Sequence, residues 1–144
     1  MKLPEWKDEA LFLLRLAIGV IFFMHGSQKV LGLFGGGGLQ ATVQGFESHL
    51  GIPPVWGYVA AFTEFLGGLG LIGGLFTRLS ALGIASIMGV AVWKVHGANG
   101  FFLNISCEAG KGHGMEYNVA ILGGALALLL MGAGRYSLDR KVFK

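Results

Sequence analysis

The sequence predicts an all-α integral membrane protein, in which one domain of 144 residues forms a four-transmembrane-helix bundle. Hydrophobic residues make up 53% of the chain and charged residues only 13%, a balance typical of chains that lie largely in lipid. Glycine occurs 26 times, and small residues let membrane helices approach each other closely. Four apolar stretches have roughly the 17–25 residues that cross a bilayer as a helix, and they lack the strict alternation of barrel strands.

The four spans are expected at about residues 10–33, 56–76, 79–96 and 117–133. The first span is expected to remain in the protein and not to act as a cleaved signal peptide. Acidic residues offset the basic start of the chain, and no small-residue cleavage site follows Met24.

The distribution of lysine and arginine predicts that both termini lie in the cytoplasm. With four spans, the termini and the turn between the second and third spans share one side of the membrane. That side carries most of the basic residues: Lys2, Lys7, Arg78, Arg135, Arg140, Lys141 and Lys144. The opposite loops hold only Lys111 clear of the helices. Arg15, just inside the first span, is expected to reach outward to anionic lipid headgroups.

The two outer loops differ in character. In the first, a GGGG tether precedes apolar residues at helical spacing, which predicts a short amphipathic helix on the outer surface from about Leu39 to Leu50. Pro53 and Pro54 then separate this helix from the second span. The second outer loop has no periodic pattern of hydrophobic residues, and it would suit a lid over a site or a contact with a partner protein. It contains a glycosylation-type sequence at Asn104 and the single cysteine, Cys107, which is expected to be an exposed bystander.

Polar residues in the spans gather at one predicted depth. His25 and Lys29 lie four residues apart, so they share a face of the first helix. The helical rise places both His25 and Glu64 about 12–13 Å below the outer end of their spans. Ionisable groups at such depth usually face the bundle interior. We therefore expect a polar pocket of His25, Lys29 and Glu64 near the outer face.

The rim of this pocket is expected to come from the last two spans. Lys94 and His96 end the third span, and Glu116 and Tyr117 begin the fourth. Residues two apart cannot both point inward from a regular helix. We expect His96 to face the pocket, with Lys94 as the alternative.

The same polar residues also suit purely structural roles. Lys29 and Glu64 would suit an ion pair that fixes helix register, and Lys29 alone would suit a side chain that extends outward to solvent. A metal site of His25, His96, Glu64 and Glu116, or a haem held by the two histidines, is less well supported, because no metal-binding motif is visible. No metal ligand is therefore predicted.

Several motifs of this sequence carry no function. The GLGLIG at 68–73 matches a dinucleotide-binding pattern, but it lies inside an apolar run and is expected to serve helix packing. The cations are too scattered for nucleic-acid binding. No flavin, iron–sulfur or c-type haem motif is seen, and His49 and His113 are expected to face solvent.

The sequence resembles the DoxX family of small four-helix membrane proteins. The resemblance lies in LLRLAIGVIFFMHGSQKVLG, with its HG-x-x-K core at His25, Gly26 and Lys29, in AAFTEFLGGLGLIGGLFTRLSALGIA around Glu64, and in AVWKVHG with a later EYN. That family is related to the quinone-reducing subunit of thiosulfate:quinone oxidoreductase, and some members act in thiol and oxidative-stress handling as subunits of larger complexes. The resemblance implies that His25, Lys29, Glu64 and His96 form the polar core.

The resulting hypothesis is a membrane oxidoreductase component of the bacterial inner membrane. It would bind a quinone or similar hydrophobic redox partner, with His25, Lys29 and Glu64 as catalytic groups. The predicted ligand-binding groups are His96, Lys94, Glu116 and Tyr117. The expected partners are membrane lipids and either further copies of the chain or a larger redox complex. The alternatives are a non-catalytic accessory subunit or, less well supported, a small-molecule or lipid carrier.

Overall fold

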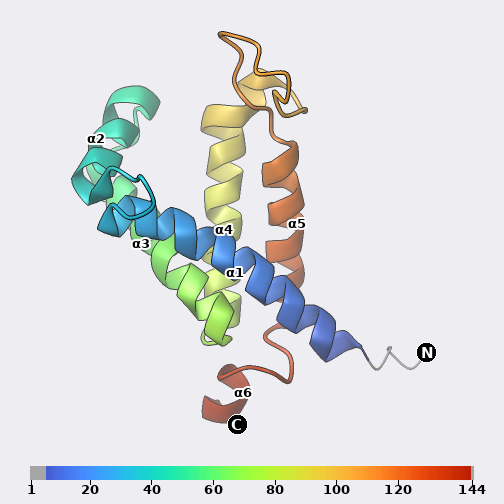
Figure 1. Ribbon diagram of the computed structural model, residues 1–144. Coiled ribbons are helices and arrows are strands. Elements are labelled where there is room, and N and C mark those ends of the chain that lie inside the picture. Colours follow the sequence, from blue (N-terminus) through green and yellow to red (C-terminus); the bar gives the residue numbers. More distant parts are fainter. Residues whose placement is uncertain (1–5, 144) are drawn as a thin grey trace.

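The computed structural model describes residues 6–143, and this part of the chain is helical with no strand (Figure 1). The helices are α1 (Lys7–Leu31), α2 (Gly38–Leu50), α3 (Pro54–Gly73), α4 (Thr77–Ala91), α5 (Glu116–Met131) and α6 (Asp139–Val142). A π-helical turn, η1 (Val92–His96), and a 3-10 turn, η2 (Gly97–Asn99), extend α4. Lys2 and Lys144, which contribute to the predicted orientation, lie outside the described residues.

Within residues 6–143, three helices are long and apolar enough to cross a membrane. They are Lys7–Leu31, Pro54–Gly73 and Thr77–Asn99, which confirms three of the predicted spans as apolar helices of sufficient length. The fourth predicted span, 117–133, is present as α5 (Glu116–Met131), with both ends within two residues of the expected ones, but this helix is short for a membrane crossing. α5 has 16 residues, which corresponds to about 24 Å against a hydrocarbon core of about 30 Å. It ends at Met131 because Gly132 has a φ of 78°, which leaves the helical region.

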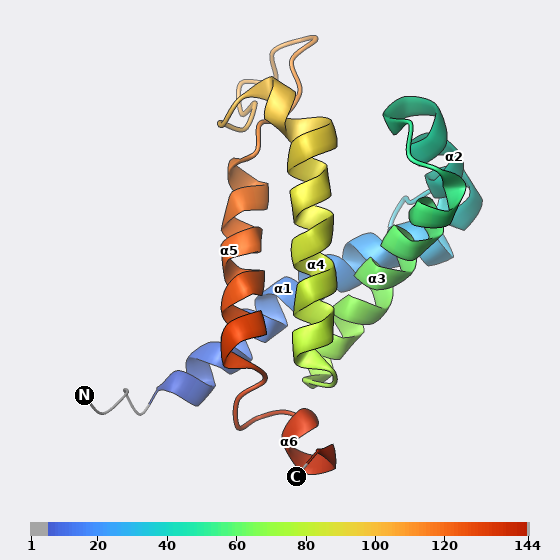
Figure 2. The same ribbon diagram turned by 180° about the vertical axis from the view of Figure 1, so that it is seen from behind.

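The helices form two pairs that cross each other. α4 and α5 run side by side, and α1 lies obliquely across them with α3 packed along it (Figures 1 and 2). Buried residues from both pairs form one core, which includes Leu11, Ile18, Phe22, Leu71, Ile84, Ile121 and Leu128. The outward faces are also apolar, with Leu13, Leu66 and Leu130 more than half exposed. An apolar exterior around an apolar core is what lipid, and not water, requires of a protein surface.

Glycines bring α1 and α3 into backbone contact. A side chain at Gly68 would collide with the backbone of Phe23, and one at Gly26 would collide with Phe65. At Gly19 it would come within 2.9 Å of the Ile72 nitrogen. Gly68 therefore serves helix packing, in agreement with the interpretation of GLGLIG as a packing sequence.

The predicted amphipathic helix is present as α2. Pro54 occupies the first turn of the following helix, where its missing N–H costs nothing. Val43 is buried and packs on Gly57 of α3, so the apolar face of α2 rests against α3. α2 and the 100–115 loop lie at one end of the molecule, and the α3–α4 turn lies with α6 at the other (Figure 1).

The expectation for Arg15 is wrong. Its side chain does not reach toward lipid headgroups, because it is only 1% exposed and lies inside the fold. The guanidinium donates one hydrogen bond to the Leu71 carbonyl at 3.1 Å and another to the Tyr136 carbonyl. These bonds tie α1 to the end of α3 and to the C-terminal segment.

Candidate functional site

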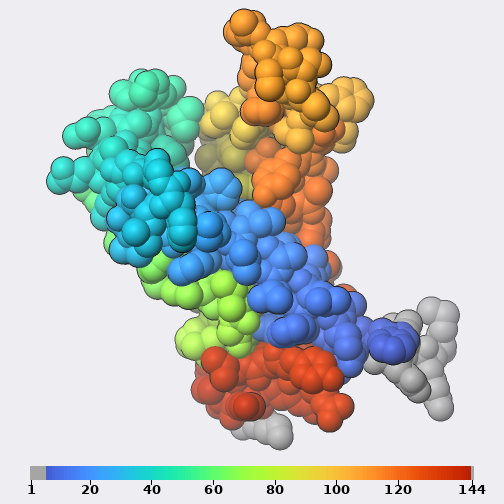
Figure 3. Space-filling view, in the orientation of Figure 1, coloured from blue at the N-terminus to red at the C-terminus, as the bar shows by residue number. Residues whose placement is uncertain are grey.

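A cavity of about 960 Å³ lies between the two helix pairs, toward the end that carries α2. Side chains from α1, α2, α3, α4, α5 and the 100–115 loop line it, and most of them are apolar. In the space-filling view, α2 and the 100–115 loop stand apart at this end, with α4 visible between them (Figure 3).

An ion pair lies on the α1–α3 side of this cavity. The Lys29 ammonium contacts the Glu64 carboxylate, and both residues line the cavity. The Glu64 side chain is 5% exposed and that of Lys29 is 24% exposed. The expectation that Lys29 extends alone to solvent is therefore wrong, whereas the ion-pair interpretation is confirmed. Pairing offsets the cost of burying each charge, and it also links two helices.

His25 lies at the same level as this pair. Its neighbour Gly26 packs on Phe65, the neighbour of Glu64, so α1 and α3 bring these positions side by side. The two positions therefore lie at the same level along the α1–α3 pair. The imidazole is exposed in the isolated chain and lines the cavity.

The end of α4 brings both Lys94 and His96 to the cavity. The expectation that only one of them faces inward assumes a regular helix. The chain instead forms the π-helical turn η1, in which the Gly97 N–H bonds to the Val92 carbonyl, so the usual angular spacing does not hold. The Lys94 ammonium lies 4.6 Å from the centroid of the Trp93 ring, a cation–π contact at the rim.

The 100–115 loop is organised by Asn104. This side chain is 8% exposed, donates hydrogen bonds to the carbonyls of Glu108 and Lys111, and accepts one from the Glu108 N–H. The amide is thus engaged within the loop and is not presented for glycosylation. Cys107 is exposed, as expected.

Hydrogen bonds fix the tautomers of two histidines at the cavity rim. The His96 Nδ1 lies 2.9 Å from the His113 carbonyl, which only accepts, so in the neutral ring Nδ1 carries the proton and Nε2 is an acceptor. The His113 Nδ1 accepts from the Asn104 N–H at 3.2 Å, so its Nε2 is a donor. The cavity rim therefore offers the His96 Nε2 as a hydrogen-bond acceptor and the His113 Nε2 as a hydrogen-bond donor.

The structure separates the predicted rim residues of α5. Tyr117 lines the cavity, whereas Glu116 does not. The sequence prediction missed several lining residues, among them Asn118 and His113. Asn118 is 5% exposed and donates to the Met88 sulfur at 3.5 Å, and His113 lines the cavity although its side chain is exposed. Asn118 could have been found from the sequence, because it is a polar residue inside an apolar run. His113 lies in an irregular loop, where no sequence pattern indicates which side chains face the cavity.

The alternative metal site is not assembled in the part of the chain that the structure describes. No three side chains of histidine, cysteine, aspartate or glutamate gather there closely enough to hold an ion. The cavity instead combines one carboxylate, two amines and three imidazoles with apolar walls. Such a site suits a mostly apolar ligand with a few polar atoms.

Comparison with known proteins assigns the chain to a family. The family model described as DoxX matches residues 10–97. The chain is 31% identical over 132 residues to the Bacillus subtilis protein named "Putative oxidoreductase CatD", covering 92% of this chain and 86% of that one. It is 27% identical over 142 residues to the Escherichia coli "Inner membrane protein YqjF", covering 99% and 98%. No solved structure matches. With three helices in its described part that are long and apolar enough to cross a membrane, the chain is an integral protein of the bacterial inner membrane, and it belongs to the DoxX family.

Proposed function

We propose that this chain is a membrane oxidoreductase component that binds a quinone, or a similar hydrophobic redox partner, in the cavity between its helix pairs. The observation that carries the proposal is the placement of the Lys29–Glu64 pair, His25 and His96 in the wall of a largely apolar cavity of about 960 Å³. Family membership and the similarity to the Bacillus subtilis protein named "Putative oxidoreductase CatD" support a role related to oxidoreduction.

In this proposal each polar group has one task. His25 donates a hydrogen bond to a carbonyl oxygen of the quinone, or His96, whose Nε2 is an acceptor in the neutral ring, accepts one from a hydroxyl of the quinol. Glu64 holds or releases the proton that accompanies electron transfer, because it is the buried carboxylate of the cavity wall. Lys29 offsets negative charge that develops on the reduced ligand. Electrons come from a partner protein or a small reductant.

The proposal includes the orientation of the chain. Three long helices and the shorter α5 would cross the inner membrane with both termini in the cytoplasm. The cavity would then lie toward the outer leaflet, open to lipid between α3 and α4. Because α5 is short, its crossing would need local thinning of the bilayer or an adjoining copy or partner subunit.

Tryptophan fluorescence tests the binding step. Trp56 and Trp93 line the cavity, and Trp6, the third tryptophan of the chain, does not. In purified protein, a benzoquinone with a short alkyl tail should quench this fluorescence saturably. Because Glu64→Gln removes the ion pair that positions Lys29 at the cavity wall, it should weaken binding about tenfold.

The matched control is Glu47→Gln, an exposed acid on α2 outside the cavity. This variant should bind the quinone as the unmodified protein does. Absence of saturable quenching, or equal binding by Glu64→Gln, would overturn the proposal. The Lys29–Glu64 pair would then serve to join α1 and α3, as in an accessory subunit.

A further inference from the structure

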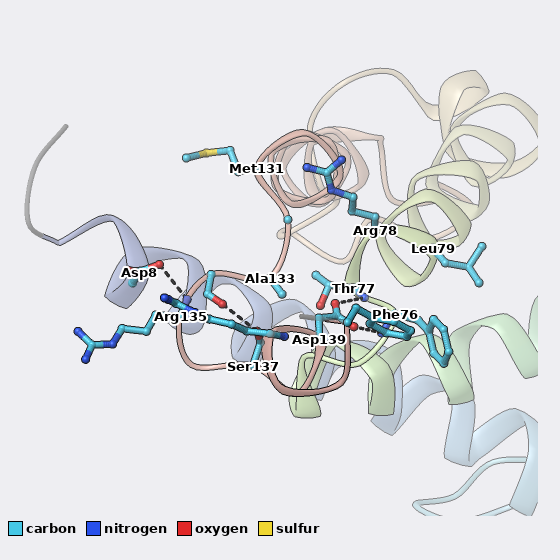
Figure 4. A pocket seen from close by; sticks show the side chains of 14 residues that line it. Asp8, Phe76, Thr77, Arg78, Leu79, Met131, Ala133, Arg135, Ser137 and Asp139 are labelled. Atoms are coloured by element: carbon cyan, nitrogen blue, oxygen red, sulfur yellow. Dashed lines mark hydrogen bonds between the residues drawn. The ribbon is translucent and has the colours of Figure 1, made fainter. Parts of the chain in front are cut away.

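A second depression of about 640 Å³ lies at the opposite end of the molecule, between the start of α4, the end of α5 and the C-terminal segment (Figure 4). Three arginines line it: Arg78, Arg135 and Arg140. Figure 4 shows Arg78 and Arg135 on opposite sides of it. Guanidinium groups are the side chains best suited to binding phosphate, since they donate in a planar fork.

The two acids in this depression are already hydrogen-bonded to backbone amides. The Asp139 oxygens accept from the N–H groups of Phe76 at 2.6 Å and Thr77 at 2.9 Å. An Asp8 oxygen accepts from the Arg135 N–H at 2.8 Å. Arg78 uses one nitrogen to donate to the Leu130 carbonyl at 3.2 Å, which leaves its other N–H groups for a ligand.

A buried hydroxyl gives a second, independent indication of a ligand. Thr77 is 0% exposed and lines the depression, and its Oγ1 has no hydrogen-bond partner within the described residues. Buried polar atoms are nearly always paired, so an orphan next to a depression indicates a missing partner.

Apolar residues complete the lining. Leu79 and Met131 line the depression and are exposed by 68% and 46%. Exposed apolar side chains do not stabilise a free phosphate, whereas they can pack against the acyl chain of a lipid. The same pocket thus offers cations for a phosphate and an apolar path leading away from it.

We propose that this depression binds the phosphate group of an anionic membrane phospholipid. Arg78 and Arg140 hold the phosphate, and the attached acyl chain runs along Leu79 and Met131. The site lies where the α3–α4 turn and α6 meet the end of the bundle, which is the level of a membrane–water interface. Basic pockets between membrane helices are suited to such headgroups. This inference does not depend on the quinone proposal.

Native mass spectrometry of the delipidated full-length protein tests the site. Dioleoyl phosphatidylglycerol should bind more tightly than dioleoyl phosphatidylcholine. The double variant Arg78→Gln/Arg140→Gln should lose affinity for phosphatidylglycerol by about fivefold per arginine. Lys111→Gln, which removes a cation at the other end of the molecule, should bind as the unmodified protein does. The single variant Arg140→Gln provides the same test if the double variant does not fold.

Three results would overturn the proposal. The first is equal binding of the two lipids by the unmodified protein. The second is unchanged affinity in the folded arginine variants. The third is displacement of bound phosphatidylglycerol by inorganic phosphate at matching concentration, because the site would then recognise phosphate without a lipid.

Discussion

Arg15 is the largest fully buried side chain in the described part of the fold, and it carries a positive charge into the interior. The charge is accommodated by carbonyl oxygens, one of them from Leu71 near the C-terminus of α3, where the helix dipole favours a cation. Its partners lie 56 and 121 residues away along the chain. Sequence spacing can place an arginine near a helix end, but it cannot reveal contacts over such separations. For this reason the predicted exposure of Arg15 was wrong.

Replacing Arg15 should destabilise the protein. Arg15→Ala leaves a cavity and removes the donors for two carbonyls, so we expect a loss of roughly 2–4 kcal/mol in the free energy of unfolding. Thermal or denaturant unfolding in detergent micelles measures this loss. Arg140→Ala, at an exposed site, should change the free energy by no more than about 0.5 kcal/mol. Equal stability of the two variants would contradict the burial of Arg15.

At the scale of the element, the contact between α1 and α3 positions the site. Gly26 and Gly68 let the two backbones touch, and this fixed register brings Lys29 to Glu64. The ends of all four predicted spans fell within a few residues of the observed helices, since glycine and proline mark many of them clearly. The π-helical turn η1 was not predicted, because no local signal distinguishes it from the helix that precedes it.

A methyl group at Gly68 should separate α1 from α3. Because the new Cβ would meet the Phe23 backbone, which cannot move aside, Gly68→Ala should lower the free energy of unfolding by about 1–3 kcal/mol. Gly123→Ala is the matched control, since a Cβ there meets no atom within 4 Å. Its stability should be unchanged or slightly raised. If both variants unfold at the same temperature, the close α1–α3 contact is absent in the protein.

At the scale of the whole molecule, α2 and the 100–115 loop lie at one end, and α6 lies at the other with the α3–α4 turn (Figure 2). Hydrophobic length and glycine content predicted the all-helical membrane class from the sequence. The cavity was predicted only as a set of polar residues at one depth. Its walls depend on how the two helix pairs cross and on the irregular loop that supplies His113, neither of which has a periodic signal.

Cys107 offers a direct test of the proposed orientation. It is the single cysteine of the chain, and it is exposed in the 100–115 loop. A membrane-impermeant maleimide should label it in cells whose outer membrane has been opened and whose inner membrane is intact. Arg140→Cys in a Cys107→Ser background should be labelled only after the inner membrane is broken. The reverse pattern would place the termini in the periplasm.

The segment after α5 caps the N-terminus of α4, a helix that begins about 60 residues earlier in the chain. Asp139 supplies the acceptors for the first amides of α4, and Tyr136 supplies a carbonyl to Arg15 in α1. A ribosome still translating this protein has therefore delivered the third span to the bilayer before its N-terminal cap exists. A truncation that stops at Met131 would keep every apolar helix, yet it would leave α4 uncapped and one arginine bond unmade. Insertion can thus proceed span by span, while the finished fold waits for the segment that carries Tyr136 and Asp139.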